Sequence, residues 1–432
     1  MLLKFLQRFL AFLSKKIIKK YQPLVVGITG SVGKSSTKKA IALVLKGQLN
    51  VRQSKGNYNN EIGVPLTILG VKSPGRNILG WIRVFTLGFL KIIFKQKSYP
   101  KVLVLEMAAD RPGDIEYLVN IAPCHIGVIT SISAAHTEFF KTIEKVAMEK
   151  QMIIKNLPKD GWAVLNADNK RTYALKNKTS AQVLYYGFDT QANIQGLKVQ
   201  IDQELKEDGL EIKGLKFKVR YHGNVVPVFL PNIISLAQVQ SVLAAISVGL
   251  ALDLNLIDIV QALKAYEPLP GRMVLLSGVN NSLIIDDTYN SSPQAVESAL
   301  DTLEAIIPVS SARKWVILGD MLELGDLSEK MHREIGEKII QTDVDYLITV
   351  GKEAQYIAQQ AREKGFRQER IFSFDNSLGV VPFLKPRIKN GDIILIKGSQ
   401  GARMEKIVKN IMIRPRLAKK YLVRQSRDWL KQ

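Results

Sequence analysis

Apolar runs alternate with helical patterns along most of the chain. The runs at 102–108, 125–133 and 162–168 are almost continuously apolar and end in small or polar residues. Such runs are typical of central strands in a parallel sheet that is covered on both faces. Residues 142–157, between the last two runs, show a helical pattern. The alternation therefore predicts an α/β fold with a mostly parallel sheet.

A second alternation follows the turn EPLPGR at 267–272, where prolines and a glycine favour a domain boundary. Its strand candidates are SLIIDDTYN, KWVILGDM, YLITVG and DIILIKGS, separated by helical stretches such as SPQAVESALDTLEAI. Residues 180–230 alternate apolar and polar side chains, which predicts an antiparallel elaboration before a helix at 237–254. We predict a central α/β domain over 24–268 and a Rossmann-like C-terminal α/β domain over 269–432.

The chain begins with a basic amphipathic stretch, for which we predict a helix over 1–23. Lys4 and Arg8 interrupt its apolar side and no small-residue cleavage site follows, so a signal peptide is not expected. The longest uncharged apolar run, 9–13, is far too short to span a bilayer. The pattern favours a helix lying in a membrane interface, and a basic helix packed on its own domain is the alternative.

A second apolar and basic stretch occupies 78–95, within an expected apolar insertion at 76–98. Arg83 and Lys91 interrupt it, so an interfacial or core-packed helix fits better than a short transmembrane helix. The two segments together predict peripheral membrane contact through residues 1–21 and 78–95.

Composition places the chain among folded proteins, because 46% of its 432 residues are hydrophobic and 23% are charged. Lys and Arg number 61 against 39 Asp and Glu, and the net charge of +22 favours nucleotides, acidic metabolites or an anionic membrane surface as partners. No arginine-rich run with interleaved aromatic residues indicates a nucleic acid, so none is expected. The single cysteine, Cys124, excludes an internal disulfide and a cysteine-based zinc site. It fits a cytoplasmic location, including the inner face of the membrane.

Residues 27–37, GITGSVGKSST, carry the first chemical motif, with a strand-like run before them and a helical pattern after them. Glycines let successive backbone N–H groups close around phosphate oxygens at a helix N-terminus. In the Walker A motif, which has a glycine where this chain has Ile28, the lysine contacts the β- and γ-phosphates and the next hydroxyl binds Mg²⁺. A plain glycine turn is the alternative. We predict a P-loop for ATP and Mg²⁺ formed by Gly30, Ser31, Gly33, Lys34, Ser35 and Ser36.

The spacing GxxGxxGK[ST] resembles that of the Mur ligase superfamily, whose members form amide bonds with ATP in cell-wall and folylpolyglutamate synthesis. Seven further segments resemble motifs of that family in its order: GNYNNEIGVPLTIL (56–69), EMAADRPGDI (106–115), SISAAHTEFF (131–140), LPGRM (269–273), DDTYNSSP (286–293), LGDMLELG (318–325) and KGSQGARME (397–405). The form of 56–69, and the absence of the DNP-type signature of lysine- or diaminopimelate-adding members, are most similar to the D-alanyl-D-alanine-adding branch.

The resemblance implies an ATP-dependent, ADP-forming peptide ligase of cell-wall precursor synthesis that works as a monomer. Its most similar members add D-alanyl-D-alanine to a UDP-N-acetylmuramoyl-tripeptide. A ligase for a different, lipid-linked acceptor is one alternative, and a membrane-recruited regulatory ATPase without ligase activity is another.

The resemblance also implies a metal site near the P-loop, to which Ser35 contributes its hydroxyl. Glu106 ends an apolar strand, where a carboxylate reaches the crevice beyond the sheet and can bind Mg²⁺. His136 corresponds to a second metal ligand. Lys150 corresponds to a lysine that family members carbamylate, with Met152 where the family often has glutamate. A surface glutamate, a structural histidine and a surface lysine are the respective alternatives.

In the C-terminal half, the resemblance places Arg272 on the nucleotide phosphates and Asp287 and Tyr289 near the ribose and adenine. Lys397 is expected to act on the reacting groups. The residues expected to contact substrates are Asn59, Asn60, Asp320, Glu323, Ser399 and Arg403, with helix capping as an alternative for Asp320.

Two features depart from the family pattern. Ala237 and Ser241 stand where family members have a histidine and an asparagine that help to hold the nucleotide. Cell-wall ligases place a UDP-sugar-binding domain before the P-loop, whereas this chain has about two dozen residues there. We therefore expect the acceptor to be held by the remaining domains or presented at a membrane.

Overall fold

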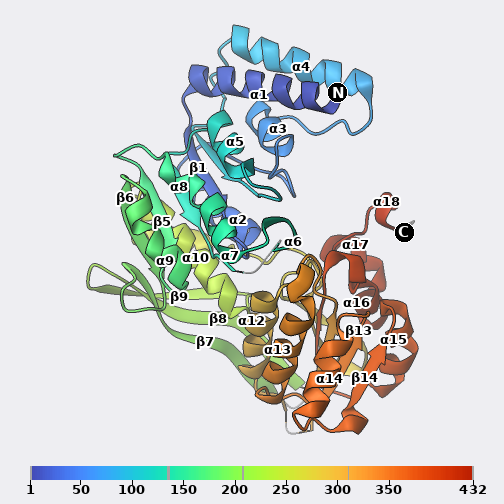
Figure 1. Cartoon of the computed structure of the whole chain (residues 1–432). Coiled ribbons are helices and arrows are strands. Elements are labelled where there is room, and N and C mark those ends of the chain that lie inside the picture. Colours follow the sequence, from blue (N-terminus) through green and yellow to red (C-terminus); the bar gives the residue numbers. More distant parts are fainter. Residues whose placement is uncertain (1, 134–136, 207–208, 310, 431–432) are drawn as a thin grey trace.

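The computed structural model describes residues 2–133, 137–206, 209–309 and 311–430, which fold around two β-sheets (Figure 1). Among these residues the first sheet has nine strands, in the order β2 (Val51–Gln53), β3 (Val102–Glu106), β1 (Leu24–Thr29), β4 (Ile126–Ile129), β5 (Trp162–Asn166), β6 (Gln182–Gly187), β7 (Ile194–Lys206), β8 (Gly209–Tyr221) and β9 (Asn224–Pro231). The pairs from β2 to β7 are parallel, and β8 pairs antiparallel with β7 and β9.

The second sheet lies in the C-terminal part. Its six strands within the described ranges have the order β10 (Val274–Ser277), β11 (Leu283–Asp287), β15 (Ile393–Lys397), β12 (Lys314–Gly319), β13 (Tyr346–Val350) and β14 (Ile371–Phe374). Every pair is parallel except β10 with β11. The predicted fold class, α/β with mostly parallel sheets, is confirmed.

Helices cover both faces of the first sheet, and each face has its own core. One face carries α2 (Lys34–Lys46), α10 (Leu236–Leu250) and α11 (Leu256–Leu263). The other carries α1 (Leu2–Tyr21), α3 (Gly63–Leu69), α5 (Asp114–Ile121), α7 (Ile143–Lys150) and α8 (Met152–Lys155). Val26 and Ile28 of β1 enter the first of these cores and Val25 the second, because successive side chains of a strand point to opposite faces. Burial on both faces explains the continuously apolar strand sequence.

Helices α1 and α4 (Ile78–Ile93) form an outer layer at one end of the molecule (Figure 1). Leu10, Leu13 and Ile17 of α1 are fully buried. The ring of Phe9 packs edge-on against Phe85 of α4 at 4.7 Å between centroids. One face of α1 therefore packs on its own domain, as the alternative expectation had it. In the described part of the chain, no helix combines the length and apolar character needed to cross a membrane.

The long strands β7 and β8 reach from the first sheet to the second core. Ile201, Leu210 and Ile212 pack against that core. The side chain of Gln203 donates to the backbone carbonyl of Ile307 at 3.4 Å and accepts from its N–H at 3.3 Å. The prediction of an antiparallel elaboration over 180–230 holds for the pairs that β8 makes with β7 and β9, whereas β6 pairs parallel with both of its neighbours. Strands β7 and β8 form a brace between the two sheets.

The predicted helix at 142–157 is divided at Gln151, which caps both α7 and α8. The short strands β2, β10 and β14 were not predicted. The other α-helices of the described residues are α6 (Thr137–Phe140), α9 (Lys170–Tyr173), α12 (Pro293–Glu304), α13 (Ser328–Ile340), α14 (Gln355–Glu363), α15 (Ser377–Leu384), α16 (Glu405–Ile411), α17 (Ala418–Tyr421) and α18 (Arg427–Leu430).

Candidate active site

The loop between β1 and α2 has a backbone shape that requires glycine. Gly30 has φ 148° and Gly33 has φ 88°, in the region that side chains disfavour. A Cβ at position 30 would lie 1.9 Å from Thr130 Oγ1. The N–H of Ser31 donates to the carbonyl of Ser131 at 2.8 Å, which ties the loop to the end of β4. The loop is therefore held at the carboxyl edge of the parallel strands, where such sheets bind ligands.

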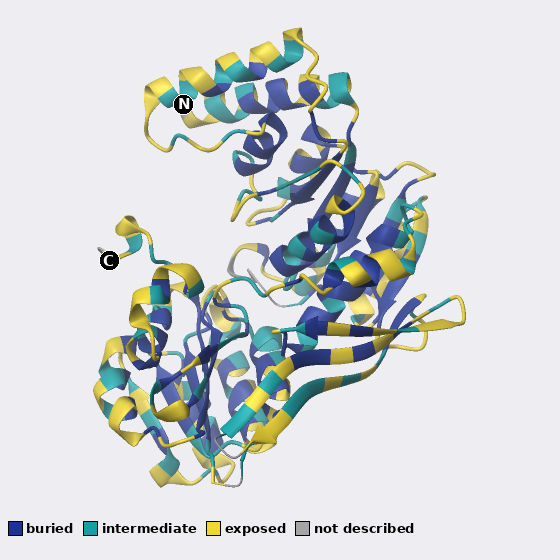
Figure 2. Ribbon diagram, turned by 180° about the vertical axis from the view of Figure 1, so that it is seen from behind, coloured by how far each residue is buried: buried dark blue, intermediate teal, exposed yellow. Residues whose placement is uncertain are grey.

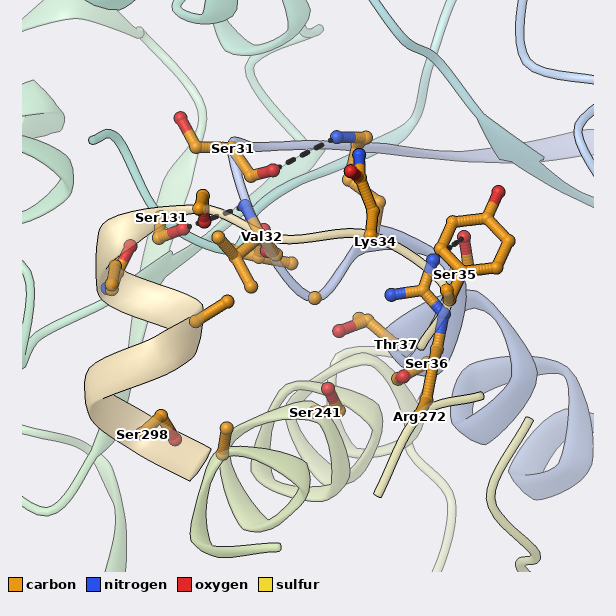
Figure 3. A pocket seen from close by; sticks show the side chains of 18 of the residues that line it. Ser31, Val32, Lys34, Ser35, Ser36, Thr37, Ser131, Ser241, Arg272 and Ser298 are labelled. Carbon is orange, nitrogen blue, oxygen red and sulfur yellow. Dashed lines mark hydrogen bonds between the residues drawn. The ribbon is translucent and has the colours of Figure 1, made fainter. Parts of the chain in front are cut away.

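Lys34 begins α2, and its ammonium turns back over this loop (Figure 3). Nζ donates to the carbonyl of Gly30 at 2.6 Å and to that of Ser31 at 3.3 Å. Burial lowers the pKa of Lys34, the Glu106 carboxylate opposes that shift, and Arg272 adds to it. The ammonium and the helix N-terminus concentrate positive charge in one small region, which suits an anionic phosphate.

Glu106, the last residue of β3, is 2% exposed and has polar partners on three sides. Its Oε1 accepts from Ser35 Oγ at 3.1 Å and from Asn59 Nδ2 at 3.2 Å. Its Oε2 forms an ion pair with Lys38 Nζ at 2.9 Å. Burial raises the pKa of Glu106, but Lys38 and Lys34 outweigh it, so the pKa lies below its ordinary value. The carboxylate therefore stays charged while it is buried.

Lys150 ends α7 and is 3% exposed. No hydrogen bond or ion pair joins its ammonium to another described residue. Burial lowers its pKa to about 7, and the positive charge of Lys34 adds to that shift. The neighbouring Glu149 accepts the N–H of Gly113 at 2.7 Å and that of Ile115 at 2.6 Å, which fixes α7 against α5. A buried amine that is partly neutral near pH 7 is nucleophilic.

Arg272 reaches the P-loop from the start of the C-terminal part. Its Nη2 donates to Ser35 Oγ at 3.4 Å (Figure 3). Its guanidinium lies 4.1 Å from the ring centre of Tyr289. Tyr289 in turn donates its hydroxyl to Asn57 Oδ1 at 2.8 Å. The preceding Gly271 has φ 65°, and a Cβ there would meet the Tyr289 nitrogen at 2.9 Å. This turn thus joins helix α2, the segment before α3 and the segment after β11 at one point.

Lys397, the last residue of β15, is buried beside the end of β11. Its Nζ forms an ion pair with Asp287 Oδ2 at 2.6 Å and donates to the carbonyl of Asn290 at 2.9 Å. Asp287 also accepts the backbone N–H of Met273 at 3.2 Å. Burial raises the pKa of the adjacent Asp286 to about 7. The carboxyl ends of β11 and β15 thereby place a fixed charge pair at the edge of the second sheet.

A cavity of about 820 Å³ connects these groups across the two sheets. The predicted site residues that line it are Ser31, Gly33, Lys34, Ser35, Ser36, Asn59, Asn60, Glu106, Arg272, Asp287, Tyr289, Glu323 and Lys397. Ala237 and Ser241 also line it. The structure thus gathers most of the predicted nucleotide and substrate residues around one space.

Some predicted site residues lie away from this lining. Gly30 and Lys150 are outside it, and His136 lies outside the described residues. Asp320 accepts the N–H of Ala354 at 2.8 Å, at the N-cap position of α14, which agrees with its alternative capping role. Ser399 and Arg403 are also absent from the lining of the cavity.

Ser399 and Arg403 make structural contacts. Ser399 Oγ accepts the N–H of Leu322 at 2.9 Å, and Arg403 pairs with Glu405 at 2.7 Å. No group of three or more His, Cys, Asp or Glu side chains is placed to hold a metal within the described ranges.

Sequence comparison matches the Mur ligase middle domain to residues 28–79 and 85–248, and the Mur ligase glutamate ligase domain to residues 271–400. A relative from Bacillus subtilis, UDP-N-acetylmuramoyl-tripeptide–D-alanyl-D-alanine ligase, is 30% identical over 403 residues, which are 93% of this chain and 79% of the relative. The chain belongs to the Mur ligase family. It is therefore an ATP-dependent, ADP-forming ligase, as predicted.

Further members of the family are similar in sequence and structure. The Escherichia coli protein of the same name is 27% identical over 387 residues, 89% of this chain and 76% of that relative. A crystal structure of MurF ligase from Thermotoga maritima in complex with ADP has a TM-score of 0.74 and 27% identity, covering 94% of this chain and 83% of that chain. MurF from Acinetobacter baumannii, at 23% identity and TM-score 0.76, shares the fold over 92% of this chain and 79% of its own.

Sequence reasoning missed three residues of this Mur ligase that contact or adjoin candidate site residues without lining the cavity. Lys38 lies one helical turn after Lys34 on the same face of α2, and that spacing could have indicated it. Glu149 stands directly before Lys150 but carries no local signal of its contact with α5. Arg424, near the end of the chain, pairs with Glu405 at 3.0 Å and donates to the carbonyl of Tyr289 at 3.1 Å. Nothing in the sequence separates Arg424 from the many other basic residues around it.

Proposed function

We propose that this Mur ligase joins D-alanyl-D-alanine to a UDP-N-acetylmuramoyl-tripeptide. The carboxylate of the tripeptide attacks the γ-phosphate of ATP, which gives an acyl phosphate and ADP. The dipeptide amine then attacks the acyl carbon and loses a proton as phosphate leaves. The observation that carries this proposal is the cavity that the P-loop, Glu106 and Arg272 share with the Lys397–Asp287 pair. The 30% identity to an enzyme of that name supports the choice of substrates.

The roles of the residues follow from their charges. Lys34 and Arg272 would neutralise the charge that develops on the transferred phosphoryl group. Asp287 and Tyr289 would contact the nucleoside. Lys397 and Glu323 would face the reacting groups and the incoming dipeptide, with Asn59 and Asn60 across the cavity.

We propose Mg²⁺ as the cofactor, held by Ser35 and Glu106. Their oxygens lie 3.1 Å apart, the carboxylate is charged, and hard oxygen ligands suit this ion. When bound, Mg²⁺ supplies further neutralisation of phosphate charge. His136 and a carbamylated Lys150 remain the proposed second set of ligands.

Lys150 is expected to be active only as a carbamate. Its pKa of about 7 leaves the amine increasingly neutral as the pH rises through 7, and only a neutral amine adds to CO₂ with loss of a proton. Depleting bicarbonate at pH 8 should therefore lower ligase turnover. Lys150→Gln should lower it about 100-fold and short carboxylic acids should partly restore it. Lys155→Gln, an exposed lysine on α8, serves as the control. Turnover independent of CO₂ would contradict a carbamate.

The experiment on the whole proposal is product analysis. Mass spectrometry with ATP, D-alanyl-D-alanine and a panel of UDP- and lipid-linked peptides should show a new amide on the UDP-tripeptide, with ADP released only when acceptor and amine are both present. An amide only on lipid-linked peptides would replace the proposed acceptor with the lipid-linked alternative. ADP release without acceptor or amine would indicate the regulatory ATPase instead.

We also propose peripheral membrane contact through residues 1–21 and 78–95. Its support is the outer position of α1 and α4, which carry many exposed residues (Figure 2). Part of these exposed residues are apolar. Such contact suits a lipid-linked acceptor but does not require one.

A further inference from the structure

Helix α4 carries many of its large apolar residues on the side that faces solvent. Val84 and Gly88 of α4 are buried against the rest of the molecule. The large exposed apolar residues of α4 and its end are Ile78, Leu79, Ile82, Phe89, Leu90, Ile93 and Phe94, which are 40–76% exposed. A helix on the surface of a globular protein ordinarily presents polar residues there. An apolar outer face of this size indicates a binding surface.

The apolar surface of α4 continues onto α1. Leu3, Phe5 and Phe12 of α1 are 47–64% exposed. The rings of Phe5 and Phe12 stack on either side of Phe9, with centroids 6.0 and 6.5 Å apart, and Phe9 lies 5.7 Å from Phe89. The ten exposed apolar residues of α1, of α4 and of the end of α4 are here called the α1–α4 face. The two helices that carry them lie side by side at one end of the molecule (Figure 2).

The charge around the α1–α4 face is almost entirely positive. Residues 1–105 contain nineteen lysines and arginines and one acidic residue, Glu61, and so hold +18 of the net charge of +22. The exposed bases of the two helices and the segment after them are Lys4, Arg8, Lys15, Lys16, Lys19, Arg83, Lys95 and Lys97. An apolar face among basic side chains is complementary to an anionic lipid surface. A symmetric dimer through this face would instead bring like charges together.

We propose that the α1–α4 face docks on an anionic lipid surface, with α1 and α4 lying in its interface. Neither helix can span the bilayer, so docking is peripheral. Gln7 of α1 donates to Glu61 Oε1 at 2.8 Å, and Glu61 lines the cavity. Docking would therefore bring that side of the cavity toward the lipid. This orientation bears on catalysis only if the proposed function holds, whereas docking itself does not depend on it.

Vesicle flotation of the full chain tests the proposal. Vesicles of phosphatidylcholine mixed with phosphatidylglycerol should bind the chain, and vesicles of phosphatidylcholine alone should bind it at least about tenfold less. The double variant Ile82→Glu/Phe89→Glu should lose about tenfold in binding, because both side chains are exposed and would place charge in the interface. The triple variant Lys15→Gln/Lys16→Gln/Lys19→Gln should lose on the order of 100-fold, since each base contributes severalfold.

The control variants change the same kinds of side chain, exposed apolar residues and exposed lysines, at positions outside α1 and α4. Ile257→Glu/Leu378→Glu changes two exposed apolar residues on α11 and α15, and Lys330→Gln/Lys352→Gln/Lys364→Gln removes three exposed lysines. Both should bind mixed vesicles like the parent. All variants should keep the parent's thermal transition and its turnover with soluble substrates.

Absence of binding to mixed vesicles, or equal losses in the control variants, would overturn the proposal. So would a dimer that light scattering detects and Ile82→Glu/Phe89→Glu abolishes, since a second copy would then cover the face. If the parent chain bound mixed vesicles as expected but showed no ligase turnover, the result would contradict the proposed function and leave the docking proposal supported.

Discussion

Replacing Lys34 with alanine is expected to lower ligase turnover by about 10³-fold or more and to remove measurable ATP binding. The reason is that Lys34 supplies the ammonium nearest to the P-loop carbonyls, at 2.6 Å from Gly30 O, and the charge of a phosphate has to be met there. Amine-dependent ADP release and calorimetry with Mg-ATP measure the two effects.

The same substitution should leave the fold intact. Burial lowers the pKa of Lys34, so the native state gains little from holding this charge, and alanine removes a desolvated group from the start of α2. The control is Lys46→Ala, an exposed lysine at the other end of the helix, which should keep full turnover. If Lys34→Ala turned over substrate at the parent rate, the P-loop would have no part in the reaction.

Glu106→Gln is expected to lower turnover by about 10²- to 10³-fold and the free energy of unfolding by about 3 kcal/mol. Glutamine keeps the shape of the side chain but leaves the ammonium of Lys38, 2.9 Å away, buried without its counter-charge. Steady-state kinetics at varied Mg²⁺ and urea denaturation measure the two effects. Glu116→Gln, on the exposed side of α5, is the matched control and should change neither.

The pH dependence of stability follows from the direction of the Glu106 shift. Burial would raise its pKa, but Lys38 and Lys34 together lower it below the ordinary 4.5. A carboxylate with a lowered folded pKa stabilises the fold above its unfolded pKa, and that contribution is lost as the pH falls through the folded value. Glu106→Gln should therefore show a smaller loss of stability below about pH 4.5 than the parent.

A second substitution separates stability from chemistry. Lys38→Met combined with Glu106→Gln should recover part of the lost stability, because the orphaned buried charge is gone, yet remain as inactive as the single variant. Recovery of turnover in the double variant would show that Glu106 serves only to neutralise Lys38.

The sequence predicted what depends on local pattern. Continuous apolar runs identified β3, β4 and β5, because strands buried on both faces need apolar residues at every position. Glycine spacing identified the P-loop, because the positive φ of Gly33 follows from local backbone geometry alone. The family motifs indicated Arg272, Asp287 and Lys397 as site residues, and in the structure all three line one cavity.

Contacts between segments that are distant in the sequence could not be predicted from local sequence patterns. Burial of Lys150 depends on how α7 packs, and its charge gives no sign of it in the sequence. Glu149 binds the start of α5, and Arg424 binds the turn at Tyr289, only because the fold brings these segments together. Short strands such as β14 are too brief to show a period. For residues 78–95 the sequence could not distinguish an interfacial helix, with an outer apolar face, from a helix packed in the core.

The brace formed by β7 and β8 sets how the two halves of this ligase can part. If the two halves were joined only near residue 268, they could rotate freely about that connection. Ile201, Leu210 and Ile212 prevent this because they pack against the second core. If the two halves separate to admit a bulky acceptor, either the two-stranded ribbon bends or these three side chains leave the second core and become exposed to water. We therefore expect the β7–β8 ribbon to limit how far the two halves can separate and to favour their closure after product release.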